Sequence, residues 1–438
     1  MPLLTFRRPR ARNLALIGCL VLAVACTERE PTLPGDRLPV RPTEARATAP
    51  AEVPPLALPP ARANAEWTHP SGTAAGRPEH PALAPMPGLR WSVDLGQGSS
   101  KRTRLITVPV VGGGLVFALD SAGQLSAVHP NGQVAWRQSL APAGERAESG
   151  FGGGLAYADG TVYATTGYAE VLAIDAATGA IRWRHRLEAP ARAAPAVLDG
   201  RVFAIARNDT AVALDAGTGS VLWRISGGGA SAGLLGGASP AAAGPLVVLP
   251  FSSGEVLGVV ARSGTQAWGQ AVTGGRRGLV RNRISDMSGD PVIAGDTVYA
   301  SNQAGRTVAL DRLTGERRWT MDEGAYGPAW PVGGSIFLLS DTGTLVRADA
   351  ATGQILWSQQ LPEYGTSRRR EALPHHGPVL AGGRLWVAGA DRQLRTFDPT
   401  TGNPLGAIAL PAPAASTPVV AGGVLYVVTT DGRLHAFQ

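Results

Sequence analysis

The chain has 438 residues and a formal net charge of +7, with 40 basic against 33 acidic side chains. Four of the arginines lie in the first twelve residues, so the charge without this N-terminal stretch is only about +3. Lys101 is the single lysine, and no basic stripe alternates with aromatic residues, so the composition gives little support to nucleic-acid binding.

Residues 1–25 have the two parts of an export signal. The first part is basic, with Arg7, Arg8, Arg10 and Arg12 and no acid, and the second is an apolar run from Leu14 to Ala25. That run is too short to span a bilayer. We therefore expect it to direct export and to be removed.

The apolar run ends in Leu22-Ala23-Val24-Ala25-Cys26. Small residues before a cysteine resemble the lipobox of bacterial lipoproteins, which implies that Cys26 becomes a lipid-modified N-terminus. Cys19 follows a similar pattern, but cleavage there would leave a hydrophobic region of only about six residues. An ordinary signal with incidental cysteines is the alternative. Cleavage before Cys26 would leave a mature chain with one cysteine and no internal disulfide, so its stability must come from its core.

The stretch 26–88 follows the signal and is dense in Pro, Ala and Arg, with Pro54-Pro55 and Pro59-Pro60. It shows no sustained apolar period of 2 or 3.6 residues. This composition predicts a disordered tether behind the lipidated Cys26. A flexible chain of that length reaches roughly 40–50 Å, so the folded part could stand clear of a membrane.

A repeat fills the chain from Leu89 to Gln438. Each copy reads approximately Ala-x-Asp-x-x-Thr-Gly-x-x-x-Trp, and the copies recur about every 45 residues, the length of one four-stranded propeller blade. Leu405 stands in the tryptophan position of the seventh copy. The tryptophans of the other copies are Trp136, Trp183, Trp223, Trp268, Trp319 and Trp357.

The residue types of the repeat follow from its expected geometry. Aspartate in Asp-x-x-Thr-Gly can accept hydrogen bonds from backbone amides ahead of it, and glycine tolerates positive φ at the turn exit. Tryptophan is a large plate with one polar edge. We expect it to dock between adjacent blades with its indole N–H satisfied.

The last copy is incomplete, because Pro418 to Gln438 supplies only three strands. Leu89-Arg-Trp-Ser-Val-Asp-Leu matches the missing fourth strand and puts Trp91 in the docking position. The N-terminal strand would therefore complete the last blade and leave no open sheet edge. The prediction is an all-β, eight-bladed propeller over residues 89–438, with seven blades as the main alternative.

The repeat resembles that of the pyrroloquinoline-quinone (PQQ-like) propeller family over Leu89 to Gln438. The lipobox, the low-complexity stretch and the eight units together resemble more narrowly the BamB family of outer-membrane assembly lipoproteins. That resemblance implies a non-enzymatic scaffold without cofactor, anchored by lipid at the periplasmic face of the outer membrane. It also implies binding to a BamA-like partner through loops between blades. Fold alone would not assign this function.

The resemblance also suggests where the partner binds. Arg283-Ile-Ser-Asp-Met-Ser-Gly-Asp-Pro-Val is similar to the family's acidic contact segment. Asp286 takes the first acidic position, Ser288 stands where the second acid is expected, and Asp290 could substitute for it. A second contact segment of the family corresponds to Leu234-Leu-Gly-Gly-Ala-Ser-Pro in this chain. This stretch keeps the family's leucines and serine but lacks its arginine and glutamate. The predicted partner-binding residues are Leu234, Leu235, Arg283, Asp286 and Asp290.

These residues also have a plainer interpretation. Asp286 could simply cap a turn, and the arginines beside it could form a solvated loop. These arginines are Arg276, Arg277, Arg281 and Arg283.

The sequence contains no metalloprotease, phosphate-loop or nucleophile-elbow motif, so we predict no catalytic, cofactor-binding or metal-binding residue. His375-His376 is the one pair that suggests a metal, but adjacent strand residues point to opposite faces. Together with Arg368-Arg369-Arg370, the histidine pair favours an exposed basic loop. This loop is a candidate for a second contact with a partner. A periplasmic PQQ-dependent dehydrogenase and a solute- or polysaccharide-binding propeller are the alternative functions.

Overall fold

The computed structural model describes residues 53–146, 150, 152–229, 236–276, 284–365 and 371–438. These residues form 32 strands, and no helix among them is long and apolar enough to cross a membrane.

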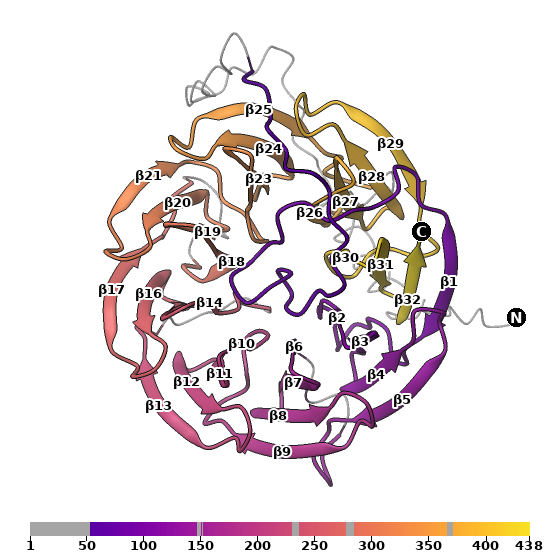
Figure 1. The fold of residues 1–438 in the computed structure, drawn as a ribbon, viewed down its shortest axis with the longest axis vertical. Coiled ribbons are helices and arrows are strands. Elements are labelled where there is room, and N and C mark those ends of the chain that lie inside the picture. Colours follow the sequence, from indigo (N-terminus) through magenta and orange to yellow (C-terminus); the bar gives the residue numbers. More distant parts are fainter. Residues whose placement is uncertain (1–52, 147–149, 151, 230–235, 277–283, 366–370) are drawn as a thin grey trace, which may run out of the picture. The chain divides into compact units, whose positions relative to one another are not determined.

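The strands make eight four-stranded sheets arranged as the blades of a propeller (Figure 1). Seven blades use four successive strands, and the eighth combines both ends of the ring. The prediction of eight blades is confirmed. The blades are blade 1, β2 (Val110–Gly112), β3 (Leu115–Leu119), β4 (Gln124–Val128) and β5 (Val134–Ser139); blade 2, β6 (Gly153–Ala158), β7 (Thr161–Thr166), β8 (Glu170–Asp175) and β9 (Ile181–Arg186); blade 3, β10 (Ala196–Leu198), β11 (Arg201–Ile205), β12 (Thr210–Asp215) and β13 (Val221–Ser226); blade 4, β14 (Ala241–Ala243), β15 (Leu246–Pro250), β16 (Glu255–Val260) and β17 (Gln266–Ala271); blade 5, β18 (Met287–Ala294), β19 (Thr297–Asn302), β20 (Arg306–Asp311) and β21 (Arg317–Met321); blade 6, β22 (Trp330–Val332), β23 (Ser335–Leu339), β24 (Thr344–Asp349) and β25 (Ile355–Gln360); blade 7, β26 (His375–Ala381), β27 (Arg384–Gly389), β28 (Gln393–Phe397) and β29 (Pro404–Ala409); and blade 8, β30 (Val419–Ala421), β31 (Val424–Thr429), β32 (Arg433–Phe437) and β1 (Leu89–Asp94).

The ring closes through β1, as the incomplete last copy predicts. β1 pairs antiparallel with β32, from Leu89 opposite Phe437 to Asp94 opposite Arg433. Gly88 and Gln438 exchange two backbone hydrogen bonds of 3.0 and 2.9 Å beyond the last paired residues. The two ends of the ring therefore hold each other, and blade 8 is a complete four-stranded sheet.

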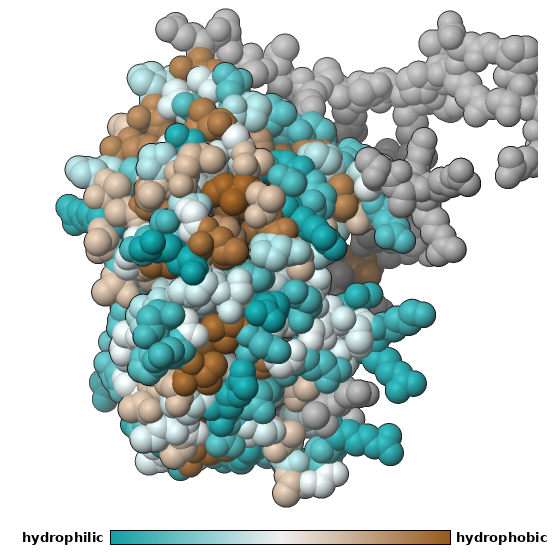
Figure 2. Space-filling model, turned by 90° about the vertical axis from the view of Figure 1, so that its right-hand side faces the viewer, coloured by the Kyte–Doolittle hydropathy of each residue, from teal (hydrophilic) through white to brown (hydrophobic). Residues whose placement is uncertain are grey.

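The inner strands carry the core, and the outer strand of each blade faces solvent on one side. In blade 2 every residue of β7 is buried, whereas β9 alternates between half-buried and exposed residues. This is the period-2 pattern of a sheet with one covered face. The rim that carries β1 and β29 shows apolar patches among hydrophilic ones (Figure 2). Exposed Leu89 and Leu405 lie on these two strands.

Each repeat tryptophan links its blade to the next one. The Trp183 Nε1–H of blade 2 donates to the Ala216 carbonyl in the turn of blade 3, at 3.0 Å. Its indole covers Gly219, where a Cβ would come within 2.7 Å of the ring and where φ is +71°. The same bond joins each repeat tryptophan to the following blade, through Trp91, Trp136, Trp223, Trp268, Trp319 and Trp357.

Residues 53–88 differ from the expected tether. They form no named strand, yet they lie across the centre of the ring, drawn in indigo in Figure 1. Trp67 is fully buried and its ring centroid lies 6.2 Å from that of buried Trp330 on β22. The predicted boundary at residue 88 is therefore corrected. We refer to residues 53–88 as the plug.

The absence of periodicity in the plug has a physical reason. Its backbone hydrogen bonds to the ring go to the ends of strands in different blades, and those within the plug form only isolated bridges and turns, so no ladder imposes a period. Trp67 pairs with Val111 of β2 in both directions, at 2.8 and 2.7 Å. The residues that hold the plug in place lie far along the chain, so its own sequence shows no period that reports these contacts. It shows instead a composition typical of disordered segments.

Candidate partner-binding site

The two faces of the ring carry different parts of the chain. In a four-stranded antiparallel meander, the first and third turns lie on one face, and the second turn and the connection to the next blade lie on the other. We call these the turn face and the connection face. The plug bonds to the ends of inner strands on the turn face. Leu234 and Leu235 belong to the connection 227–240, and Arg283 and Asp286 belong to the connection 272–286; both connections are on the connection face. Asp290 lies instead in the strand β18.

Three predicted contact residues, Leu234, Leu235 and Arg283, lie outside the described residues. The described end of the connection 227–240 bonds to β18, which begins where the connection 272–286 ends. The Ala238 amide donates to the Met287 carbonyl at 3.1 Å, and the Ser239 amide donates to Asp290 Oδ1 at 2.7 Å. The two segments that the sequence assigned to one surface therefore meet at the junction of blades 4 and 5.

Asp286 is not on the surface in this structure, because its side chain is buried with 1% of the residue exposed. One of its carboxylate oxygens accepts a hydrogen bond from Arg192 Nη2. Arg192 precedes β10 and donates at the same time to Asp209 Oδ1, at 2.9 Å. Asp286 thus belongs to a buried Asp–Arg–Asp cluster and does not offer its carboxylate directly to a partner in this conformation.

The cluster connects three blades. Asp209, in the β11–β12 turn of blade 3, also accepts the Ser252 amide of blade 4 at 2.9 Å. Asn302 of blade 5 donates from Nδ2 to the Asp286 carbonyl at 3.1 Å. Removing one partner of such a buried network leaves an uncompensated charge, which typically costs about 3–5 kcal/mol. We therefore assign Asp286 a positioning role for the connection that it ends.

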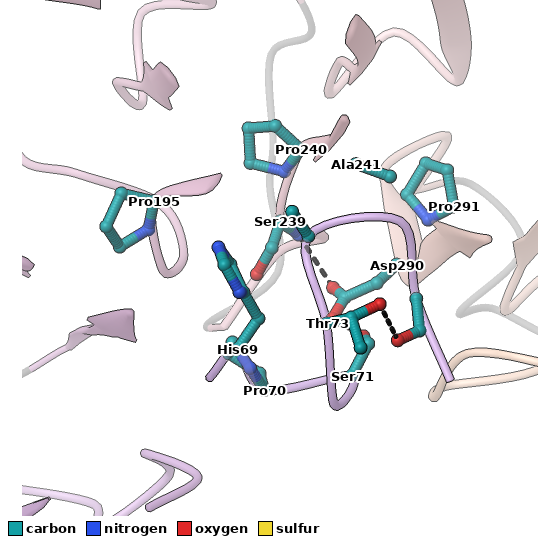
Figure 3. A pocket seen from close by; sticks show the side chains of 12 residues that line it. His69, Pro70, Ser71, Thr73, Pro195, Ser239, Pro240, Ala241, Asp290 and Pro291 are labelled. Atoms are coloured by element: carbon teal, nitrogen blue, oxygen red, sulfur yellow. Dashed lines mark hydrogen bonds between the residues drawn. The ribbon is translucent and has the colours of Figure 1, made fainter. Parts of the chain in front are cut away.

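Asp290 lies at the contact between ring and plug. It accepts Ser71 Oγ–H of the plug and the Ser239 amide, each at 2.7 Å. Burial raises the pKa of its carboxyl, while the Ser239 amide, the Ser71 hydroxyl and the Arg77 charge act in the opposite direction. Asp290, Ser71 and Ser239 are among the residues that line a cavity of about 10 Å³ (Figure 3), room for one water molecule.

Arg276 is the one described member of the four arginines crowding this connection. It is held by two acids, Asp341 and Glu323, whose oxygens lie 3.0 and 2.7 Å from its nitrogens. Desolvation lowers its pKa, but the two acids more than compensate, and the net shift is upward. The interpretation of a purely solvated arginine loop therefore fails at Arg276, which is half-buried and paired.

His375 and His376 form no metal site with the residues that the structure describes. His375 hydrogen-bonds through Nε2 to the Pro362 carbonyl at 2.8 Å. Burial lowers the pKa of His376 to about 4, so its imidazole is neutral near pH 7. Arg368, Arg369 and Arg370 lie outside the described residues.

Comparison with known proteins identifies the family. The family model described as "Outer membrane protein assembly factor BamB" matches residues 121–359 and 360–438. A protein of that name from Salmonella typhimurium is 30% identical over 357 residues, covering 80% of this chain and 88% of that relative. One from Xanthomonas campestris is 34% identical over 366 residues, covering 80% and 85%. The chain belongs to the BamB family.

Solved structures show the same fold. BamB from Moraxella catarrhalis matches with a TM-score of 0.65 at 20% identity, covering 78% of this chain and 99% of that one. A quinohemoprotein alcohol dehydrogenase from Comamonas testosteroni matches with a TM-score of 0.62 at 15% identity, covering 86% and 81%. Both likenesses concern the fold alone. The BamB relatives are named as outer membrane protein assembly factors.

Two parts of the site were not predicted from the sequence. The first is the plug, for which Trp67 was the available signal, since a large aromatic residue is unusual in a disordered stretch. The second is the Arg192–Asp209 pair. A lone arginine among Ala191, Ala193 and Ala194, just before an inner strand, is a position where a charge is expected only with a buried partner.

Proposed function

We propose that this BamB-family protein is a lipid-anchored scaffold of outer-membrane protein assembly. In this proposal Cys26 carries the lipid, and the protein sits at the periplasmic face of the outer membrane. It holds the periplasmic part of a BamA-like protein against its connection face and promotes insertion of barrel proteins without catalysing a reaction.

The observation that carries this proposal is that the connection 227–240 meets β18, the strand that begins where the connection 272–286 ends, at the junction of blades 4 and 5. Ala238 bonds to Met287 and Ser239 bonds to Asp290, both on β18. The sequence resemblance implies partner contacts in these two connections. We propose Leu234, Leu235 and Arg283 as the contacting residues, with Asp286 and Asp290 holding the ends of the connections in place.

Affinity purification from detergent-solubilised outer membranes tests the partner. The tagged wild-type protein should recover a BamA-like protein, and a Leu234→Ala/Leu235→Ala variant should recover at least fivefold less. Leu313→Ala is the matched control, because Leu313 is 77% exposed in the β20–β21 turn of the opposite face. Equal recovery by all three proteins would reject these contacts, and quinone-dependent dye reduction by the purified chain would favour the dehydrogenase alternative.

The anchor is tested separately. Incorporation of labelled palmitate should be lost in Cys26→Ser and kept in Cys19→Ser, with the Cys26 variant released from the membrane fraction. Label retained by Cys26→Ser would refute the anchor at this position.

A further inference from the structure

The plug makes one circuit of the channel mouth. Its successive contacts, from Asn64 to Pro81, meet blades 8, 1, 2, 3, 4, 5, 6 and 7 in that order (Figure 1). In chain order they join the Asn64 carbonyl to the Gly422 amide, Trp67 to Val111, the Thr68 carbonyl to the Tyr157 amide, His69 Nε2 to the Val197 amide, the Ala74 carbonyl to the Ala242 amide, the Ala75 carbonyl to the Ile293 amide, the Glu79 carbonyl to Trp330 Nε1, and the Pro81 carbonyl to the Gly382 amide, at 2.7–3.2 Å.

Buried side chains fix the register of this circuit. Trp67 is fully buried against Trp330, and His69 is 5% exposed with its Nε2 accepting the Val197 amide at 3.0 Å. A shift of the plug by one residue would place Glu66 or Thr68 in the tryptophan position. The contacts therefore specify one sequence in one register.

The two surfaces also fit closely where they carry no side chain. A Cβ on Gly382, in the β26–β27 turn, would come within 2.2 Å of the Leu83 carbonyl oxygen. A Cβ on Gly76 of the plug would come within 2.7 Å of Val292 Cγ1, and φ of Gly76 is +130°. Such close backbone approaches require glycine on one side. They indicate a formed binding surface, complementary to the peptide in this one conformation.

We propose that the turn-face mouth of the channel is a peptide-binding site whose resident ligand is residues 53–88 of the same chain. The ring recognises the plug through strand-end amides and the Trp67 pocket, and the plug joins all eight blades. The match to the family model begins at residue 121 and therefore does not include this segment.

The site also determines where the N-terminal segment joins the ring. The Pro54 carbonyl accepts Arg347 Nη2 at 2.9 Å, and Arg347 also donates to the Thr400 carbonyl in the β28–β29 turn. The chain therefore enters on the turn face. Where Cys26 carries the lipid, which rests on the proposed function, the anchor is attached to the turn face and the connection face is left for the partner.

A cut made after folding tests whether the plug binds as a peptide. A protease recognition site is inserted between Pro85 and Met86, both exposed, in the Cys26→Ser protein with an N-terminal tag. After cleavage the tagged fragment, which contains the plug, should retain the untagged ring on the affinity resin. Glu79→Ala is the control, since its exposed side chain is removed while its carbonyl contact stays, and it should retain the ring as well.

Two variants within the plug should lose this retention. Trp67→Ala removes the buried indole, and Gly76→Ala forces a Cβ against Val292; each should release at least nine-tenths of the ring into the flow-through. Tryptophan fluorescence before cleavage establishes that the ring is folded, and the second variant serves if the first does not fold. Release of the ring from the wild-type fragment, or retention by both variants, would overturn the proposal. Neither result depends on recovery of a BamA-like protein.

Discussion

Arg192 is a cation that reaches two acids inside the ring. The arginine is 5% exposed and pairs with Asp209 and Asp286, which are each 1% exposed. Replacing it by methionine keeps most of the volume but leaves two buried carboxylates without their cation. We expect Arg192→Met to lower the free energy of unfolding by about 3–5 kcal/mol in urea denaturation.

Arg207→Met provides the comparison for this variant. Arg207 is exposed in the β11–β12 turn, which also carries Asp209. Its backbone amide donates a hydrogen bond to the Pro190 carbonyl, and this bond does not involve the side chain. A surface substitution of this kind typically changes stability by no more than about 0.5 kcal/mol. Equal stabilities for the two variants would mean that the buried cluster contributes nothing to the ring.

His69 makes the plug sensitive to pH. Its Nε2 accepts the Val197 amide, so the imidazole must be neutral at that nitrogen, and burial lowers its pKa to about 4. The unfolded chain binds a proton at this histidine below about pH 6.5, whereas the folded chain does so only near pH 4. Stability linked to His69 is therefore complete above about pH 6.5 and is lost as the pH falls toward 4.

The expected loss from His69 alone is about 2 kcal/mol between pH 7.5 and pH 5. His376, with a pKa also near 4, adds a loss in the same window, so the measurement is a difference between two proteins. Chemical denaturation at both pH values should show a steeper fall for the wild type than for His69→Gln, whose amide oxygen can still accept the Val197 amide. Parallel pH dependences would contradict the assignment of a neutral, buried His69.

The links between blades explain the exception in the repeat. Each repeat tryptophan docks on the turn between the third and fourth strands of the following blade, as Trp357 does on Pro399 and Gly402. Leu405 would face the corresponding turn of blade 8. In that blade the third and fourth strands are β32 and β1, which are joined by no turn because they are the two ends of the ring. An indole at position 405 would therefore lack the turn carbonyl and the positive-φ glycine that the repeat tryptophans contact in the other blades.

The two positions should respond differently to exchange. Trp357→Leu loses the bond to the Pro399 carbonyl and the contact with Gly402, and should lower the free energy of unfolding by about 2–3 kcal/mol. Leu405→Trp should change it by no more than about 0.5 kcal/mol, since Leu405 is 45% exposed. Thermal or urea unfolding measures both. A clear gain from Leu405→Trp would show that blade 8 offers a docking surface after all.

The elements differ in how far the sequence could predict them. Repeated strands and the closure by Trp91's strand follow from local patterns of period 2 and turn residues, and the structure has both. The plug could not be found in this way, because its bonds go to residues distant in the chain. At the candidate site, the position of Asp286 in a connection was predictable. Its burial was not, since its partner Arg192 comes from another blade.

For the molecule as a whole, the plug gives the two faces of the ring separate roles. The turn face holds the plug and the entry of the N-terminal segment at Pro54. The connection face holds the connections 227–240 and 272–286, and the first of them bonds to β18, which begins where the second ends. A protein held at a membrane through one face and bound to a partner through the other can bridge the two. This arrangement requires that partner binding depend on the connection face alone.

Attaching a bulky group to one face at a time tests this requirement. In a Cys26→Ser background the mature chain has no other cysteine, so Gly228→Cys and Leu313→Cys each carry one reactive thiol. Gly228 is exposed in the connection after β13, where a Cβ meets only ordinary contacts, and Leu313 is exposed on the turn face. Coupling maleimide-polyethylene glycol to the thiol of the Gly228→Cys variant should weaken binding of the BamA-like periplasmic domain at least tenfold, by steric exclusion. The same coupling in the Leu313→Cys variant should leave binding within twofold, as measured by biolayer interferometry. The reverse result would assign the partner to the turn face and contradict the proposed division.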